Sequence, residues 1–213
     1  YSALSCANSL NFAETIQLLK KRGNAMQNAV PKGEGGMIAV LGSTIENIEE
    51  ILNKKKNEFV IEIANDNSNG QIVLSGKNKD LEKFSDFLKE KNIKNVKLPV
   101  SAPFHCKLMS KATEIMKIEI ENTNFKNFKN ILISNVTANE ILNKDDLKKL
   151  LIDQIENRVR WRESINFMIE KGVQSFTEIG PGKVLSGLIK RIDKNVKIRT
   201  INSIDDIKNF KNE

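Results

Sequence analysis

The order of strand-like and helix-like segments between residues 37 and 100 constrains the fold of this chain more than any other feature. Apolar runs and amphipathic stretches follow one another there as strand, helix, strand, strand, helix and strand, at residues 37–41, 45–55, 59–64, 71–75, 79–91 and 95–99. That βαββαβ order is typical of a ferredoxin-like module. Residues 65–70 are rich in Asn and Gly, which tolerate left-handed backbone, and therefore predict a tight turn between antiparallel strands. We expect residues 37–100 to form a ferredoxin-like subdomain.

The segments on either side of this module have an α/β pattern. Asn11 and Glu14 predict a capping box, and apolar residues at helical spacing then predict one buried helix face, formed by Phe12, Ile16, Leu19, Gly23, Met26 and Val30. Gly23 in this stripe predicts the close approach of another element. The segments predicted after the module are helix 107–121, strand 131–135, helices 144–156 and 162–171, strand 175–179, a helix ending at 192, and strand 197–201. Strands that alternate with helices indicate a parallel layer, so residues 1–36 and 101–213 are expected to form one α/β subdomain that the module interrupts.

His105 is the single histidine of the chain and lies in a loop between a predicted strand and a predicted helix. It is the first candidate for proton transfer, because imidazole is the side chain that ordinarily changes charge near neutral pH. Pro99 and Pro103 restrict the loop, and the start of the following helix favours the neutral imidazole, which is a competent general base. A lone histidine is nevertheless more often a surface residue or a hydrogen-bonded core residue. Both interpretations stay open on these residues alone.

The charge and the cysteines limit the partners and the chemistry. A net charge of +7 and an isoelectric point near 9.3 indicate an acidic partner, which includes nucleic acid, an anionic membrane, a phosphorylated small molecule or an acidic protein. No apolar stretch reaches the roughly 20 residues of a membrane helix, so we expect a soluble protein. Cys6 and Cys106 fit neither a disulfide framework nor a metal site, and they predict a reducing compartment. No serine has the flanking glycines of a Gly-x-Ser-x-Gly elbow, so the chain shows no nucleophile of that type.

Several polar positions have both a structural and a functional interpretation on the sequence alone, and these are Arg22, Asn65, Asn67 and Gln154. The Gly-Pro-Gly turn at residues 180–182 precedes a helix whose free amides are able to hold an anion, but it lacks the spacing of a phosphate-binding loop, which favours a structural turn. Lys190 and Arg191 either complement the dipole of that helix or dock an acidic partner.

Six ordered motifs together resemble the malonyl-coenzyme A:acyl carrier protein transacylases, which load malonyl groups for fatty acid synthesis. The motifs are YSAL at 1–4, LKKRGNAMQ at 19–27, ANDNSNGQIVLSG at 64–76, PVSAPFHCKLM at 99–109, Gln154 with Arg160-Trp161, and EIGPGKVLSGL at 178–188. The match extends over essentially the whole chain. It implies an incomplete α/β-hydrolase-like acyltransferase subdomain with an inserted ferredoxin-like subdomain.

The resemblance also implies roles for individual residues. His105 would be the general base, Arg22 would pair bidentately with the free carboxylate of the malonyl group, and the main-chain carbonyl of Gln154 would orient the imidazole. A planar guanidinium matches a carboxylate in two parallel hydrogen bonds, which lysine cannot reproduce. Phe104 resembles the residue of malonyl-selective relatives and should disfavour an α-methyl branch by ~1–3 kcal/mol. Further candidates for substrate binding are Met26, Asn65 and Asn67, and Lys190 and Arg191 are candidates for docking the carrier protein.

The implied substrates are malonyl-CoA and an acidic, phosphopantetheinylated acyl carrier protein, with no cofactor and no metal. The implied cycle is ping-pong, with His105 first activating a serine and later the phosphopantetheine thiol. In the family the serine stands in a Gly-His-Ser-Leu-Gly-Glu elbow directly followed by Tyr-Ser-Ala-Leu. We therefore expect the serine to lie upstream of Tyr1, and this chain by itself to be inactive.

Two other functions remain as alternatives, namely a non-catalytic fragment that binds carrier protein and, less favoured, a basic nucleic-acid-binding protein. RNA-recognition modules of βαββαβ order stack bases on aromatic residues of their central strands, and the strand at 71–75 has none. We accordingly expect neither a nucleic-acid nor a membrane partner, a monomeric state, and a bacterial cytoplasm or the plastid lumen of a eukaryote with an AT-rich genome.

Overall fold

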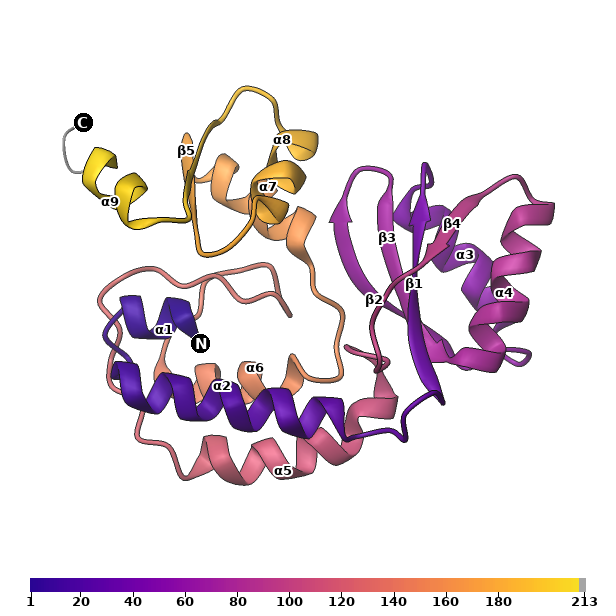
Figure 1. Ribbon diagram of the computed structural model, residues 1–213, viewed down its shortest axis with the longest axis horizontal. Coiled ribbons are helices and arrows are strands. Elements are labelled where there is room, and N and C mark those ends of the chain that lie inside the picture. The colour runs from indigo at the N-terminus through magenta and orange to yellow at the C-terminus, as the bar shows by residue number, and fades with distance from the viewer. Residues whose placement is uncertain (211–213) are drawn as a thin grey trace.

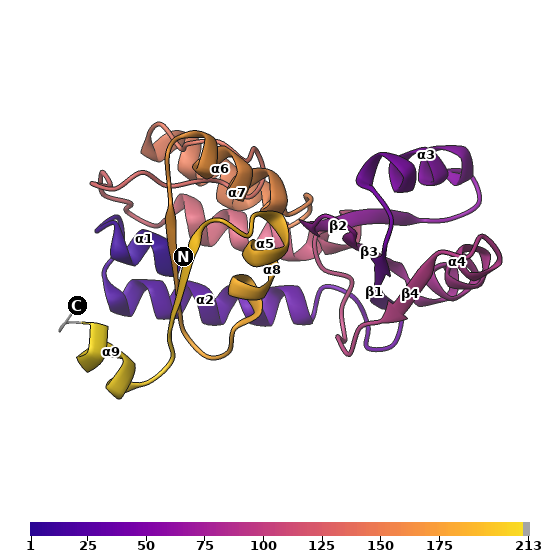
Figure 2. The same ribbon diagram turned by 90° about the horizontal axis from the view of Figure 1, so that it is seen from above.

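The computed structural model describes residues 1–210. In Figures 1 and 2 a four-stranded sheet with two helices forms one end of the molecule, and the C-terminal helix lies at the opposite end. The predicted class, an α/β chain with an inserted ferredoxin-like subdomain, is confirmed. No helix within residues 1–210 is both long enough and apolar enough to cross a membrane.

The ferredoxin-like subdomain consists of β1 (Gly35–Leu41), α3 (Ile45–Lys55), β2 (Ile61–Ser68), β3 (Gln71–Lys77), α4 (Asn78–Glu90) and β4 (Lys94–Lys97). Its strands lie in the order β2-β3-β1-β4, and every neighbouring pair is antiparallel. Apolar side chains of alternate strand positions pack under α3 and α4, with Ile48, Leu74 and Phe84 fully buried. The opposite face of the sheet buries fewer apolar residues. There Met37 and Val73 pack against Phe104, which belongs to the loop after β4.

The predicted turn at residues 65–70 is wrong over most of its length. β2 continues through Asn65 to Ser68, and only Asn69 and Gly70 form the turn, with Gly70 at a φ of +77°. Two irregularities interrupt the β2–β3 register, as β-bulges do. The strand is also extended by a distant partner, because Asn65 forms a parallel bridge with Val159.

The second core lies among α1 (Ser2–Cys6), α2 (Phe12–Gln27), the short 3-10 helix η1 (Lys107–Met109), α5 (Ser110–Glu121) and α6 (Lys144–Asp153). The capping box at Asn11 is present, with its side chain accepting from the Glu14 amide at 2.9 Å. The predicted buried face of α2 holds at Met26 but is wrong over most of its length, since Phe12 is 75% exposed and Ile16 47%. Beside Met26 the helix buries Thr15, Leu18 and Ala25. No atom lies within 4 Å of a β-carbon built on Gly23, so the predicted close approach at this position is also absent.

The remaining elements are α7 (Trp161–Glu170), β5 (Ser175–Ile179), α8 (Val184–Ile192), β6 (Lys197–Ile201) and α9 (Ile204–Phe210). β5 and β6 pair in parallel, as the alternation of strands and helices predicted. The predicted buried strand at 131–135 is wrong, because this segment forms only the isolated bridge Ile133–Glu140 and Ile131 is 73% exposed. An apolar run becomes a strand only when a neighbouring strand completes its hydrogen bonds.

Candidate active site

His105 lies in the loop between β4 and η1, in a left-handed backbone conformation with a φ of +59°. Its Nδ1 lies 2.8 Å from the main-chain oxygen of Gln154, the residue that caps α6 at its C-terminal end. A carbonyl oxygen only accepts hydrogen bonds, so Nδ1 carries the proton and Nε2 of the neutral ring keeps its lone pair. Within residues 1–210, Nε2 makes no hydrogen bond. This nitrogen is therefore available to take a proton from a bound group.

The surroundings keep the imidazole neutral. Burial lowers the pKa of His105, the hydrogen bond to the Gln154 carbonyl opposes that change, and the positive charge of Arg22 lowers the pKa further. The net pKa lies below the usual value for histidine. A neutral imidazole at physiological pH is the form that acts as a general base.

Two further contacts fix the loop that carries His105. The backbone amide of Lys107 donates to Oε1 of Glu62 on β2 at 3.0 Å. The Sγ of Cys106 lies 3.1 Å from the Pro103 carbonyl oxygen, and burial raises the pKa of this thiol. Cys106 is fully buried and protonated, so it is a packing residue and not a nucleophile.

Arg22 projects from α2, half-buried, with its guanidinium carbon 6.0 Å from the centre of the Tyr1 ring. Its Nε is buried and has no hydrogen-bond partner. No carboxylate within residues 1–210 lies at ion-pair distance from it. Burial lowers the pKa of Arg22 without removing its charge. A half-buried cation that has no counterion among the described residues is an uncommon arrangement, because desolvation is costly, and it favours a bound anion.

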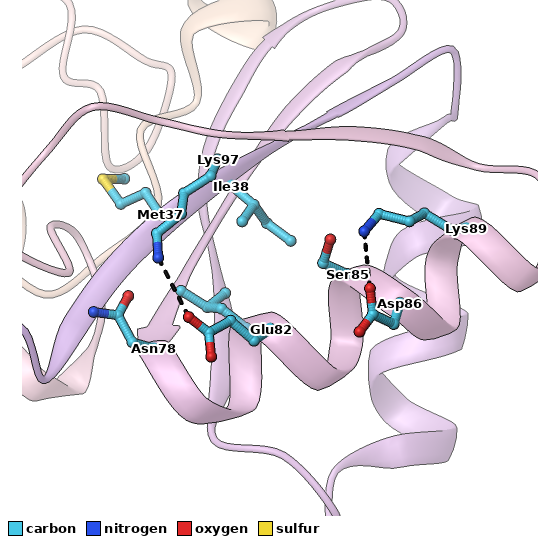
Figure 3. A pocket seen from close by; sticks show the side chains of 9 residues that line it. Met37, Ile38, Asn78, Glu82, Ser85, Asp86, Lys89 and Lys97 are labelled. Carbon is cyan, nitrogen blue, oxygen red and sulfur yellow. Dashed lines mark hydrogen bonds and ion pairs between the residues drawn. The ribbon is translucent and has the colours of Figure 1, made fainter.

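His105 lines a groove of about 760 Å³ between the ferredoxin-like subdomain and the segment that joins α6 to α7. One wall is β2, and the other includes Glu156, Arg158 and Arg160. A smaller cavity of about 140 Å³ lies between α4 and β1, where the ion pairs Glu82–Lys97 and Asp86–Lys89 border it (Figure 3). None of the predicted site residues lines this smaller cavity.

The ring of His105 contacts the main-chain oxygen of Gln154, and Arg22 lies close enough for its charge to lower the pKa of His105, whereas the other predicted residues have different surroundings. Phe104 is half-buried and packs against the second core and against the sheet face that carries Met37 and Val73, and Met26 is buried in α2. Asn65 and Asn67 are half-buried on β2, and within residues 1–210 neither side chain bonds to the His105 loop. Lys190 and Arg191 are exposed at the C-terminal end of α8, where Arg191 lies 3.5 Å from the Gln71 side chain.

The turn at residues 180–182 is structural, as the sequence favoured. The carboxylate of Glu178 accepts from the amides of Leu185 and Ser186 at 3.1 and 2.8 Å. These two amides of the first turn of α8 therefore already have an anionic partner within the chain.

Three residues of functional interest were missed by the sequence analysis. Asn135 accepts a hydrogen bond from the Gln154 side chain at 2.9 Å. Asp66 is 1% exposed and pairs with Arg162 of α7. Each of these contacts joins residues far apart in the chain, so no local sequence pattern predicts it.

Comparison with known proteins adds to this geometry. The family model described as "Acyl transferase domain" matches residues 1–209. The chain is 43% identical to the malonyl CoA-acyl carrier protein transacylase of Bacillus subtilis (strain 168), covering 92% of this chain and 63% of that protein. It is 36% identical to the protein of the same name from Staphylococcus aureus (strain MRSA252), covering 99% of this chain and 69% of that one. The chain thus spans less than two thirds of the first relative's length and slightly more of the second.

Solved structures give the same picture. The malonyl CoA-acyl carrier protein transacylase of Clostridium perfringens superposes with a TM-score of 0.94 at 42% identity, covering 100% of this chain and 67% of that one. A complex described as a type II PKS acyl-carrier protein with its malonyl-transacylase superposes with a TM-score of 0.93 at 33% identity, covering 100% and 70%.

Proposed function

This chain belongs to the acyl transferase domain family and, within it, to the malonyl CoA-acyl carrier protein transacylases, and from that membership we propose that the protein transfers a malonyl group from malonyl-CoA to an acyl carrier protein in type II fatty acid synthesis. The observation that carries the proposal is the presence of a neutral imidazole and an unpartnered guanidinium in one region of the structure. His105 is held through Nδ1 with Nε2 free, and the half-buried Arg22 nearby has no carboxylate partner within residues 1–210.

In the proposed first half-reaction, Nε2 of His105 takes the proton of the elbow serine that the family uses, as the serine oxygen attacks the thioester carbonyl of malonyl-CoA. The imidazolium then returns the proton to the departing thiolate of coenzyme A, and the malonyl group remains on the serine as an ester. In the second half-reaction the same nitrogen takes the proton of the phosphopantetheine thiol. The thiolate attacks the ester, and the serine oxygen recovers the proton. These proton transfers require imidazole alone.

Arg22 is proposed to hold the free carboxylate of the malonyl group. Two parallel hydrogen bonds from the guanidinium to the carboxylate would satisfy the unpartnered Nε and supply the missing counterion. Phe104 and Met26 are proposed to shape the space around the acyl group, and Asn65 and Asn67 to contact the substrate from β2.

The proposed partner is an acidic acyl carrier protein, docked through Lys190 and Arg191 on α8. The net charge of +7 supports an acidic partner, and binding should weaken strongly with added salt. We propose a monomer acting in the bacterial cytoplasm. No observation favours the nucleic-acid alternative, since β3 (QIVLSGK) has no aromatic residue on which a base could stack.

The test is the intact mass of the protein after incubation with malonyl-CoA, in a form that also includes the residues that precede Tyr1. A malonyl adduct that is chased off by phosphopantetheinylated carrier protein is the expected result. The same protein with His105→Ala serves as the matched control. No adduct under conditions that load a control transacylase would overturn the proposal.

A further inference from the structure

We propose that Asn135 is a positioning residue for His105 and acts through Gln154. The consequence for catalysis rests on the proposed function, whereas the effect on the imidazole does not. Asn135 lies in the irregular segment between α5 and α6, beside the isolated bridge at Ile133. It does not contact His105, so its effect has to pass through the residue that does.

Gln154 needs an external support, because it ends a helix. The last carbonyls of a helix have no partner within it, which leaves the Gln154 oxygen free to accept from Nδ1 of His105. The peptide group that bears this oxygen makes one turn bond, from the Ile155 amide to the Ile152 oxygen at 3.2 Å, and the residues from there to Arg160 form no regular helix, so helical hydrogen bonding fixes the direction of the oxygen only weakly. A carbonyl that rotates away would leave Nδ1 without a partner and the imidazole without a defined tautomer.

Asn135 holds this irregular segment at both of its ends. Its side-chain oxygen accepts from Nε2 of Gln154 at 2.9 Å, and its main-chain oxygen accepts from the backbone amide of Arg160 at 2.8 Å. One residue thereby fixes the start and the finish of the connection between α6 and α7. The side-chain bond is the one next to His105, and it is the one that a substitution removes.

The single histidine of the chain makes the proposal testable without turnover. In a sample with isotope-labelled histidine, the imidazole gives one set of nitrogen resonances, which report its pKa and its tautomer. In the native protein we expect Nδ1 to carry the proton of the neutral ring. Asn135→Leu keeps the bulk of the side chain but removes the acceptor, and should convert this single tautomer into a mixture. It should also lower the pKa of His105, because the bond to the Gln154 carbonyl raises that pKa.

Three comparisons separate positioning from general stabilisation. Asn135→Asp keeps an oxygen that accepts from Gln154 and should restore the native tautomer. Gln154→Leu keeps the main-chain carbonyl but removes the side-chain donor, and should reproduce the effect of Asn135→Leu. It therefore tests the same hydrogen bond if Asn135→Leu fails to fold. Asn95→Leu makes the same chemical change on β4, where the hydrogen bonds of the side chain within residues 1–210 go to Ser85 and Ile93, and should leave the imidazole signals unchanged.

In the enzyme with its nucleophile, Asn135→Leu should lower kcat about tenfold and change KM for malonyl-CoA by less than about twofold, because the base and not the substrate site is displaced. The proposal would be overturned if the tautomer is unchanged in both Asn135→Leu and Gln154→Leu, or if Asn95→Leu changes it equally. If the tautomer shifts as expected but the protein is never acylated, the proposed function fails and the positioning role stands.

Discussion

The ion pair between Arg162 and Asp66 joins α7 to β2, and its loss should strongly destabilise the protein. Nε of Arg162 lies 3.1 and 3.0 Å from the two carboxylate oxygens, and one terminal nitrogen lies 2.8 Å from Oδ2. The Asp66 side chain is 1% exposed and that of Arg162 is 23% exposed. Arg162→Met removes the charge and keeps most of the aliphatic stem, so it tests the pair and not the packing.

The loss of unfolding free energy depends on which charged partner remains in the variant. Arg162→Met leaves a carboxylate that is only 1% exposed in the native structure, and breaking a buried pair in this way costs about 3–5 kcal/mol of unfolding free energy. Asp66→Asn leaves a guanidinium that is partly exposed and able to regain water, so its cost should be smaller. The double variant Asp66→Leu with Arg162→Met buries no charge and should recover most of the loss. For a protein whose total stability is about 5–15 kcal/mol, the single variant loses a large fraction.

Urea unfolding measures these differences, followed by the fluorescence of Trp161, the single tryptophan and the neighbour of Arg162. The control is Lys89→Met, which breaks the exposed Lys89–Asp86 pair on α4, with side chains 62% and 72% exposed, and should cost less than about 1 kcal/mol. The reasoning is refuted if Arg162→Met costs no more than this control, or if the double variant is as unstable as Arg162→Met.

Three further outcomes follow from the site. Arg22→Ala in the acylation-competent protein should reduce the preference for malonyl-CoA over acetyl-CoA by about 10- to 150-fold, the worth of hydrogen bonds to a charged group, and an unchanged ratio of the two kcat/KM values would exclude the clamp. His105→Ala should slow acylation by about 10²- to 10⁴-fold in single-turnover measurements, and a normal rate would mean that another base acts. Burial raises the pKa of Tyr1 to about 12, so in a pH titration the tyrosinate absorbance of this single tyrosine should appear at a higher pH than for a free tyrosine. Because the folded-state pKa is higher than the unfolded-state pKa, the stability that the neutral Tyr1 side chain contributes is present below pH 10 and is lost as the pH rises toward 12.

Features of the fold that depend on neighbouring residues were predictable from the sequence. The capping box at Asn11 needs only residues three positions apart, and the βαββαβ order follows from short runs whose period changes between strand and helix. The two prolines that precede His105, Pro99 and Pro103, also marked its loop before any contact was known. These local signals identified the subdomain and the residue proposed as the base.

Features that depend on distant residues were missed for a common reason. α2 has apolar residues on two faces, and only its packing against α5 decides that Leu18 is buried and Ile16 is not. The strand β2 passes through residues typical of a turn because β3 pairs with it as far as Ser68 and because Val159, far along the chain, bonds to both Ala64 and Asp66. The local pattern of a single sequence does not show which distant residues pair, so the Asp66–Arg162 and Asn135–Gln154 contacts were not predictable from it.

The backbone of His105 links the two parts of the structure. A φ of +59° is uncommon for a residue other than glycine, although histidine tolerates it better than most, and it persists only when surrounding contacts fix it. Those contacts come from both sides of the groove, since Gln154 at the end of α6 holds the ring and Glu62 on β2 holds the amide of Lys107. A change in the relative placement of β2 and α6 would therefore displace His105 itself. The contacts that join β2 to the α6–α7 segment and to α7, above all Asp66 with Arg162, thus stabilise the fold together with the geometry of the proposed proton transfer.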